Sequence, residues 1–351
     1  MQITQARLIP YRLPLKRPWV AAATVLHERC GMLIALTSAD GITGWGDCAP
    51  LPSSAETVQA RIFEALAALS QYLPGKDAGQ ALEESRSLAF PELRWTLETA
   101  LCDAAARRQG ISLAEHLGGI GVKAIQVNAA LGALSDGSAE EAAVALAQGY
   151  RYAKIKVGIN SVDNELAGLR AVHKATGGRL RLRLDANRAF ADADAWRFLD
   201  GVASLAVEAV EEPLSQPTLE RLATLQAASP FAIAVDESLS ELGAAALMNA
   251  QAVRRLVVKP ARIGGIAATR RLIGQAHAAG IEVVLTSVVD SAVGVTAAAH
   301  LAAALAPELA HGLATSAWLA ADVAQPLPLV GGKLLLGDSP GLGLTLHREF
   351  A

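Results

Sequence analysis

The sequence has few cysteines and no excess of charge of either sign, and both deficits narrow what the protein can be. Of the 351 residues three are cysteines, Cys30, Cys48 and Cys102, which lie far apart and form no Cys-x-x-Cys pair. We therefore expect no disulfide framework or structural zinc site, and a reducing compartment, the cytoplasm. The formal net charge of −3 argues against a nucleic-acid partner, since such proteins usually carry a basic excess.

Targeting, membrane and nucleotide-binding signals are also missing. The first twenty residues lack the apolar core of a signal peptide. The most apolar segment, residues 293–305, is interrupted by Thr296 and His300 and is too short to span a bilayer. No Gly-x-Gly-x-x-Gly or phosphate-binding loop follows the first strand of the alternating region described below. We therefore expect neither a membrane partner nor a dinucleotide or nucleoside triphosphate.

The chain has enough apolar residues for a sizeable core, and they follow two different secondary-structure patterns, one in the first part of the chain and one in the rest. Hydrophobic residues make up 52% of the chain and charged residues 19%, which excludes disorder. The first part has an α+β pattern, with strand candidates at 32–37 and 42–45 joined by a turn into a hairpin. Helical spacing follows at 56–72 and 92–109, and Gly110 is a stop signal.

From about residue 124 short apolar runs alternate with alanine-rich helical segments such as 164–176 and 267–279. Strands that alternate with helices of this length indicate βαβ units and a parallel sheet. Seven such units in roughly 190 residues favour a closed (β/α) barrel over an open sheet. After Pro326 the chain is loop-like and is expected to run back to the N-terminal part. The runs are 125–131, 152–157, 180–184, 206–210, 231–235, 255–258 and 281–285.

Charged residues close five successive runs. The second carries Lys154 and Lys156, and the next four end in Asp185, Glu211 with Glu212, Asp236 and Lys259. From Lys156 onward these positions are 29, 26, 25 and 23 residues apart, about one strand–helix repeat each. Equivalent positions on neighbouring barrel strands face one mouth, at the carboxyl end of the strands, where barrel enzymes keep their active sites.

The types of residue at these strand ends point to a metal-assisted proton transfer. Three converging carboxylates cannot all stay ionised without a counter-charge, and an all-oxygen ligand set suits Mg²⁺, or Mn²⁺ in its place, rather than zinc. The chain has only eight lysines but 23 arginines, yet three of the eight lysines stand at these strand ends. A lysine near a metal ion and a second lysine has its pKa lowered, so it can act as a base.

Each of these charges alone is more simply read as solvated or ion-paired, since structural ion pairs are common. Five in register, in the order Lys-Asp-Glu-Asp-Lys, are not explained that way. If residues 207–210 form the strand, Glu211 is the first residue past its end. We therefore take Glu211 as the ligand and give Glu212 a secondary role.

The motifs at these positions, Lys-x-Lys, Asp-Ala-Asn, Glu-Glu-Pro, Asp-Glu-Ser and Val-Val-Lys-Pro, resemble the enolase superfamily in its muconate-lactonizing enzyme subgroup, over nearly the whole chain. The resemblance implies an α/β fold, a modified (β/α)7β TIM-like barrel with an α+β capping domain. It divides the chain into the cap (1–123), the catalytic barrel (124–325) and a C-terminal segment that returns to the cap (326–351).

The same resemblance implies the roles of the site residues. Lys156 is the base that removes a proton α to a carboxylate, Lys154 is its companion and Lys259 is the opposing lysine. The metal ligands for Mg²⁺ are Asp185, Glu211 and Asp236, and the metal stabilises the resulting enediolate.

Several segments are similar to the o-succinylbenzoate synthase family: DGITGWGDCAPLP, QVNAALG, TSVVDSAVG and HGLATSAWLAAD. This implies a lyase that dehydrates 2-succinyl-6-hydroxy-2,4-cyclohexadiene-1-carboxylate to o-succinylbenzoate in menaquinone or phylloquinone biosynthesis. Both steps occur on one face, with Lys156 taking the proton and returning it to the departing hydroxide.

Other reactions of the subgroup stay open as alternatives: dipeptide epimerase, N-acylamino-acid racemase and muconate cycloisomerase. Dipeptide epimerases typically carry Asp-x-Asp near the eighth strand, where this chain has Gly-Leu-Ala-Thr at 312–315, which counts against them. Racemisation needs two lysines as proton carriers, and Lys156 and Lys259 are both present. Asp290, after the seventh strand, does not discriminate between the reactions.

Two residues are candidates for contact with a small carboxylate substrate. Ser287 either contacts the substrate or caps the following helix. Asn187, with Arg183, flanks Asp185 and could support the metal site; for Arg183 a charge pair inside the barrel is an equal alternative. The loop at Ser53 and Ser54 resembles a cap loop that closes over substrate.

His300 and His311 lie among alanines and are expected in the core or at the surface rather than as ligands. The sequence leaves assembly into a homo-oligomer open.

Overall fold

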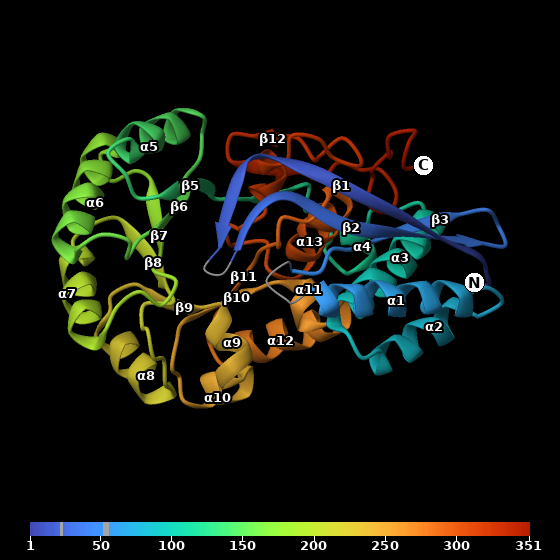
Figure 1. Cartoon of the computed structure of the whole chain (residues 1–351), viewed down its shortest axis with the longest axis horizontal. Helices are drawn as coiled ribbons and strands as arrows, with labels where there is room; N and C mark the ends of the chain where they lie inside the picture. Colours follow the sequence, from blue (N-terminus) through green and yellow to red (C-terminus); the bar gives the residue numbers. More distant parts are fainter. Residues whose placement is uncertain (22–23, 52–55) are drawn as a thin grey trace.

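The chain folds into a cap and a barrel, seen side by side in Figure 1. The computed structural model describes residues 1–21, 24–51 and 56–351. In the cap, three antiparallel strands pair in the order β1-β2-β3 and are covered by helices. The cap elements are β1 (Ile3–Ala21), β2 (Thr24–Ser38), β3 (Thr43–Cys48), α1 (Glu56–Tyr72), α2 (Ala78–Glu84), η1 (Ser85–Ser87), α3 (Pro91–Gln109) and α4 (Leu113–His116).

Two glycines of β3 bring α3 unusually close to the cap sheet. A Cβ at Gly44 would lie 2.1 Å from the carbonyl oxygen of Ala100, and one at Gly46 would lie 2.0 Å from that of Thr96. Backbone can approach backbone this closely only where no side chain intervenes. The hairpin and both helices expected from the sequence are present, and α3 ends at Gly110 with a left-handed φ of 72°. The long strand β1 was not predicted.

The second part is a curled sheet of seven parallel strands in the order β5-β6-β7-β8-β9-β10-β11, with helices on its outer side (Figure 1). Its strands are β5 (Ala129–Ala133), β6 (Tyr152–Lys156), β7 (Arg181–Asp185), β8 (Val207–Glu211), β9 (Ala232–Val235), β10 (Arg255–Val258) and β11 (Glu282–Leu285). Its helices are α5 (Ser138–Ala147), α6 (Val162–Thr176), α7 (Asp192–Val202), α8 (Leu219–Ala228), α9 (Glu237–Leu242), α10 (Ala244–Asn249), α11 (Pro260–Ile263), α12 (Ile266–Ala278) and α13 (Ala292–Leu305).

Two residues close the sheet into a ring. Gly312 donates its N–H to Leu285 at the end of β11 (2.9 Å), and His311 donates its N–H to Gln126 (2.8 Å) and accepts from Asn128 (3.1 Å). Both contacts are parallel bridges, so His311 and Gly312 occupy the eighth position of the barrel. The expected (β/α)7β barrel with an α+β cap is confirmed.

His311 is a core residue, as expected. Its Nδ1 accepts the N–H of Leu285 at 3.0 Å, which leaves Nε2 to donate to the carbonyl of Ala306 at 2.9 Å. The imidazole therefore ties the closing segment to β11 from inside. His300 is also fully buried and accepts the N–H of Ala114, in cap helix α4, at 3.1 Å.

The first run of the barrel region and the C-terminal segment differ from expectation. Residues 125–131 do not form one strand, because β4 (Ala124–Gln126) leaves the barrel direction and pairs antiparallel with β13 (Lys333–Leu335). The tail also contains β12 (Leu329–Val330), so it is not purely loop-like. It contacts the cap where Leu113 donates to Gly341 (2.7 Å) and Leu342 donates to Asp103 (2.7 Å).

No helix within the described ranges has both the length and the apolar character needed to cross a membrane.

Candidate active site

The acidic residues predicted as ligands stand at three consecutive strand ends of the barrel. Asp185 is the last residue of β7 and is the register partner of Glu211, the last residue of β8. Asp236 follows β9. Since the strands are parallel, these carboxylates share the carboxyl edge of the sheet. Lys156, the last residue of β6, is in turn the register partner of Asp185, and Lys259 follows β10.

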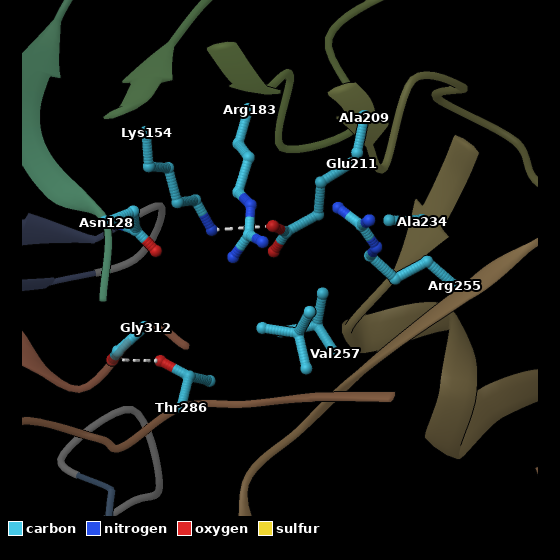
Figure 2. Close-up of a pocket in the computed structure, with 11 residues that line it drawn as sticks. Asn128, Lys154, Arg183, Ala209, Glu211, Ala234, Arg255, Val257, Thr286 and Gly312 are labelled. Carbon is cyan, nitrogen blue, oxygen red and sulfur yellow. Dashed lines mark hydrogen bonds and ion pairs between the residues drawn. The ribbon is translucent and has the colours of Figure 1, made fainter. Parts of the chain in front are cut away.

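Lys154 lies between two of the acids. Its Nζ is 2.9 Å from Asp185 Oδ2 and 2.7 Å from Glu211 Oε2, and Figure 2 shows it pointing at Glu211 across the barrel. Burial alone would lower the pKa of Lys154, but the two carboxylates outweigh it and raise that pKa. Lys154 is therefore a fixed positive charge beside the site.

One lysine does not neutralise the acids. The pKa of Glu211 is raised to about 8, first by burial and then by the negative charges of Asp185 and Asp236, and Lys154 offsets only part of this. The pKa of Asp185 is raised by burial but lowered on balance, by Lys154, by the N–H of Asn187 and by the charge of Lys156. The site as a whole is short of positive charge.

The donor set fits a divalent cation. In the part of the chain that the structure describes, no three acidic, histidine or cysteine side chains are gathered closely enough to hold a metal ion as they stand. Instead lysine ammonium groups contact all three acids, since Lys259 is ion-paired with Asp236. Each carboxylate thus faces a cation, all donors are hard oxygens, and the charge deficit is of the kind that Mg²⁺ or Mn²⁺ corrects.

The two neighbouring glutamates at the end of β8 point to different partners. Glu211 bonds Lys154 inside the barrel. The Glu212 carboxylate instead accepts the backbone N–H groups of Asp236 and Ser238. This geometry agrees with Glu211, rather than Glu212, as the candidate ligand.

The structure separates the roles proposed for the residues around Asp185. Asn187 has a left-handed φ of 43° and donates its backbone N–H to Asp185 Oδ1 at 3.1 Å, so it orients the carboxylate through its backbone while its side chain is exposed. Arg183 is a charge pair inside the barrel: its Nε is 2.7 Å from Glu208, which also pairs with Arg255 at 2.7 Å.

Ser287 is not a helix cap. The residue before α13 is Ser291, and Ser287 Oγ instead lies 2.7 Å from Thr315 Oγ1 and accepts the N–H of Val289 at 3.1 Å. This hydroxyl pair links the end of β11 to the segment after the closing residues. Its contact with substrate stays a prediction.

A small cavity separates the catalytic end of the barrel from a layer of ion pairs at its other end. Figure 2 shows Lys154 and Glu211 on one side of it, with Arg183 and Arg255 nearby. Its volume of about 30 Å³ has room for one water molecule. Burial raises the pKa of Glu208, but Arg183 and Arg255 lower it to about 2, so the layer stays fully charged.

The cap is fastened beside the site by buried polar groups that the sequence analysis did not single out. Arg29, 1% exposed, donates to the carbonyls of Val289 (3.1 Å), Pro50 (3.0 Å) and Ala49 (2.9 Å). Asp47 accepts the hydroxyl of Ser291 at 2.8 Å. These residues come from distant parts of the chain, so no local pattern marks them.

Asp290 lies in the same junction, where burial and the charge of Asp47 raise its pKa to about 7. The cap loop predicted at Ser53 and Ser54 lies outside the described residues.

Comparisons with known proteins agree with this architecture. Residues 3–118 match the family model of the mandelate racemase / muconate lactonizing enzyme N-terminal domain, and residues 137–350 match the enolase C-terminal domain-like model. The crystal structure of muconate lactonizing enzyme from Pseudomonas fluorescens, complexed with muconolactone, superposes with a TM-score of 0.85 at 28% identity, over 99% of this chain and 97% of that one.

Two curated relatives catalyse different reactions. The L-Lys-D/L-Arg epimerase of Methylococcus capsulatus is 30% identical over 369 residues, which cover 98% of this chain and 99% of the relative. The o-succinylbenzoate synthase of Desulfotalea psychrophila is 33% identical over 254 residues, which cover 70% of this chain and 68% of the relative.

Proposed function

This chain belongs to the enolase superfamily, in its muconate lactonizing enzyme subgroup, and from that membership we propose that it is an o-succinylbenzoate synthase. The reaction is the dehydration of 2-succinyl-6-hydroxy-2,4-cyclohexadiene-1-carboxylate, in the biosynthesis of menaquinone or phylloquinone. Asp185, Glu211 and Asp236 would hold the divalent cation. The substrate is thus a small carboxylate without an amino group.

The choice of this reaction rests on the side chains of the segment that begins at the barrel closure, residues 312–315. Residues 312–315 contain no acid, and Thr315 offers a hydroxyl that is paired with Ser287. A dipeptide ammonium group held there would need a carboxylate partner, whereas carboxylate, hydroxyl and carbonyl groups are served by hydroxyl donors. The identity to a curated synthase supports the same choice.

Lys156 carries the proton in both steps of the proposed reaction. Its neutral amine removes the ring proton α to the substrate carboxylate, and the same group returns that proton to the hydroxyl that departs. The C–H and C–O bonds break, a ring double bond forms, and the products are one water molecule and the aromatic acid. A bound Mg²⁺ supplies stabilisation of the negative charge that develops on the substrate carboxylate.

Lys154 and Lys259 assist by their charge. Lys154 is held as a cation by Asp185 and Glu211, so it supplies a fixed positive charge beside the base. Lys259, which follows β10, places a second ammonium group where negative charge develops.

A racemase or epimerase is the second candidate, because lysines stand on both sides of the acidic series, on β6 and after β10. Such an enzyme uses both as proton carriers on opposite faces of the substrate. The epimerase relative supports it. The same site is also compatible with cycloisomerisation of muconate.

The experiment that tests the proposal is turnover of the cyclohexadiene acid, followed by the loss of its diene absorbance with and without Mg²⁺. We expect loss only with Mg²⁺, and product identified as o-succinylbenzoate. Parallel reactions in D₂O with N-acylamino acids and dipeptides report deuterium at Cα, and cis,cis-muconate reports cycloisomerisation. Deuterium uptake or lactone formation without dehydration would replace the proposal with one of its alternatives.

A further inference from the structure

Glu212 joins the ends of three neighbouring barrel strands through its backbone. Its N–H donates to Ala234 of β9 at 2.9 Å, and its carbonyl accepts the N–H of Arg188, beyond β7, at 2.7 Å. Its φ is +45°, a left-handed conformation that residues other than glycine seldom adopt. Such outliers persist where the surroundings fix them, and they cluster at functional sites.

The side chain of Glu212 repeats these links. It is 1% exposed, and its Oε1 accepts the backbone N–H groups of Asp236 at 2.8 Å and Ser238 at 2.7 Å. Its Oε2 accepts the Ser238 hydroxyl at 2.6 Å and Arg188 Nε at 3.2 Å. Four donors compensate the burial of this carboxylate, and all four belong to the segments that follow β7 and β9, two of them to Ser238 in the first turn of α9.

Two of the three proposed cation ligands adjoin these segments, since Asp185 is the last residue of β7 and Asp236 is the first residue after β9. On the β9 side, the bond to the N–H of Asp236 fixes the backbone of that ligand directly. On the β7 side, Arg188 follows Asp185 by three residues, with Asn187 between them donating its N–H to the Asp185 carboxylate. Asn187 and Arg188 also have left-handed φ angles, 43° and 64°.

We propose that Glu212 is a positioning residue for the cation site, which holds the loops of Asp185 and Asp236 in register with Glu211. The inference rests on the proposed function in one respect, that these three acids are the ligands. Glu212 itself does not bind the cation, because its oxygens are taken up by the four donors. Partners that orient ligands in this way commonly change metal affinity 10- to 100-fold when they are replaced.

If Glu212 had a purely structural role, its replacement would lower the stability of the fold without changing the affinity for the cation. The chain offers a matched control for this distinction. Glu208 lies on the same strand, has a side chain that is 9% exposed and is also paired with arginine, but at the other end of the barrel. Its replacement should weaken folding without moving the ligands. Glu241 is a second control, since it pairs with the same arginine, Arg188, at 2.9 Å but is 56% exposed.

The test is the affinity of the whole protein for Mn²⁺, measured by calorimetry and by the electron paramagnetic resonance of free Mn²⁺, together with the melting temperature. We expect Glu212→Gln, which keeps the shape but loses the charge facing Arg188, to raise the Kd about 10-fold. Glu208→Gln and Glu241→Gln should keep the Kd within about twofold of wild type, although Glu208→Gln lowers the melting temperature.

Unchanged Mn²⁺ affinity in Glu212→Gln would overturn the inference. If that variant does not fold, Ser238→Ala removes one of the four donors and must raise the Kd in the same direction, and an unchanged Kd overturns the inference equally. A wild-type protein that binds no Mn²⁺ overturns both proposals. Wild-type binding without turnover of the cyclohexadiene acid overturns only the proposed function.

Discussion

The ammonium group of Lys154 donates to the carboxylate of Glu211 at 2.7 Å, across 57 positions of the chain. The two residues stand on β6 and β8, with Asp185 of β7 between them and bonded to the same ammonium. The consequence is that a permanent cation is built into the site but does not satisfy it, because Glu211 still has its pKa raised to about 8. In the proposed site the proton is carried by Lys156 and the cation is bound by the three acids, so substitutions at these positions can separate the two functions.

The role of Lys156 is tested by Lys156→Ala. We expect the loss of its amine to lower turnover by about 100- to 10,000-fold, the usual contribution of a general base, while Mn²⁺ still binds. The measurements are the rate of dehydration and calorimetric Mn²⁺ titration. Lys174→Ala, at an exposed position of α6, is the control and should behave as wild type; full activity in Lys156→Ala would refute the assignment.

Removal of the cation should reduce stability as well as activity. A ligand that binds only the native state stabilises it by about 2.7 kcal/mol at 100 times its Kd. We therefore expect Mg²⁺ to raise the melting temperature of chelator-treated protein and to restore turnover. Asp185→Asn should abolish both responses. An identical melting temperature with and without Mg²⁺ would contradict the ligand set.

The ion-pair layer at the far end of the barrel should matter for folding and not for chemistry. Glu208→Ala leaves Arg183 and Arg255 without their shared partner, and breaking such a buried pair costs about 3–5 kcal/mol. Glu282→Ala removes a partner of Arg255 that is 47% exposed, and should cost less than about 1 kcal/mol. Urea unfolding gives both values; equal losses would show that the layer is not a buried network.

Acid should destabilise the protein in a window set by its buried histidines. Burial lowers the pKa values of His300 and His311 from 6.5 to about 4. The unfolded chain therefore binds more protons between these limits, so the stabilisation is complete above pH 6.5 and is lost as the pH falls to about 4. Each residue contributes up to about 3 kcal/mol.

The check on this window is the free energy of unfolding measured from pH 7.5 to pH 4. Glu208 belongs to a separate, lower window, because its pKa is lowered from 4.5 to about 2, and its contribution is lost only as the pH falls through that range. His300→Gln should reduce the slope near pH 5 by about one proton. A stability that does not vary from pH 6.5 to 4.5 would disprove the assignment.

The sequence was sufficient for the parts of the fold that repeat. Apolar runs predicted β6 to β11, and the charged residues that close the first five of them put Lys156, Asp185 and Glu211 at strand ends, where the structure has them. The eighth barrel position was not predictable as a strand, because two residues give no periodicity. The arginine and acids that join cap to barrel were hidden for another reason: Arg29 and Val289 are 260 positions apart.

Glu208 shows a third limit. It stands within the pattern Val-Glu-Ala-Val-Glu of β8, three residues before Glu211, and the sequence pattern that placed Glu211 at the strand end assigned Glu208 to neither end of the barrel. Only the register of β8 on β7 and β9 places Glu208. Arg183 and Arg255, at the end of the barrel opposite to the candidate active site, then explain why a glutamate stands at position 208.

Because His311 and Gly312 complete the barrel with only two residues, the chain after them is not needed for the hydrogen bonds between barrel strands. Residues after Leu313 can vary in length and chemistry without opening the parallel ladder of the barrel, because Gly312 makes the last bond of that ring and the later strands β12 and β13 pair with each other and with β4. In a scaffold of this kind the segment that borders the substrate can change while the carboxylates and lysines at the strand ends stay in place. This is a physical route by which one fold comes to act on several substrates.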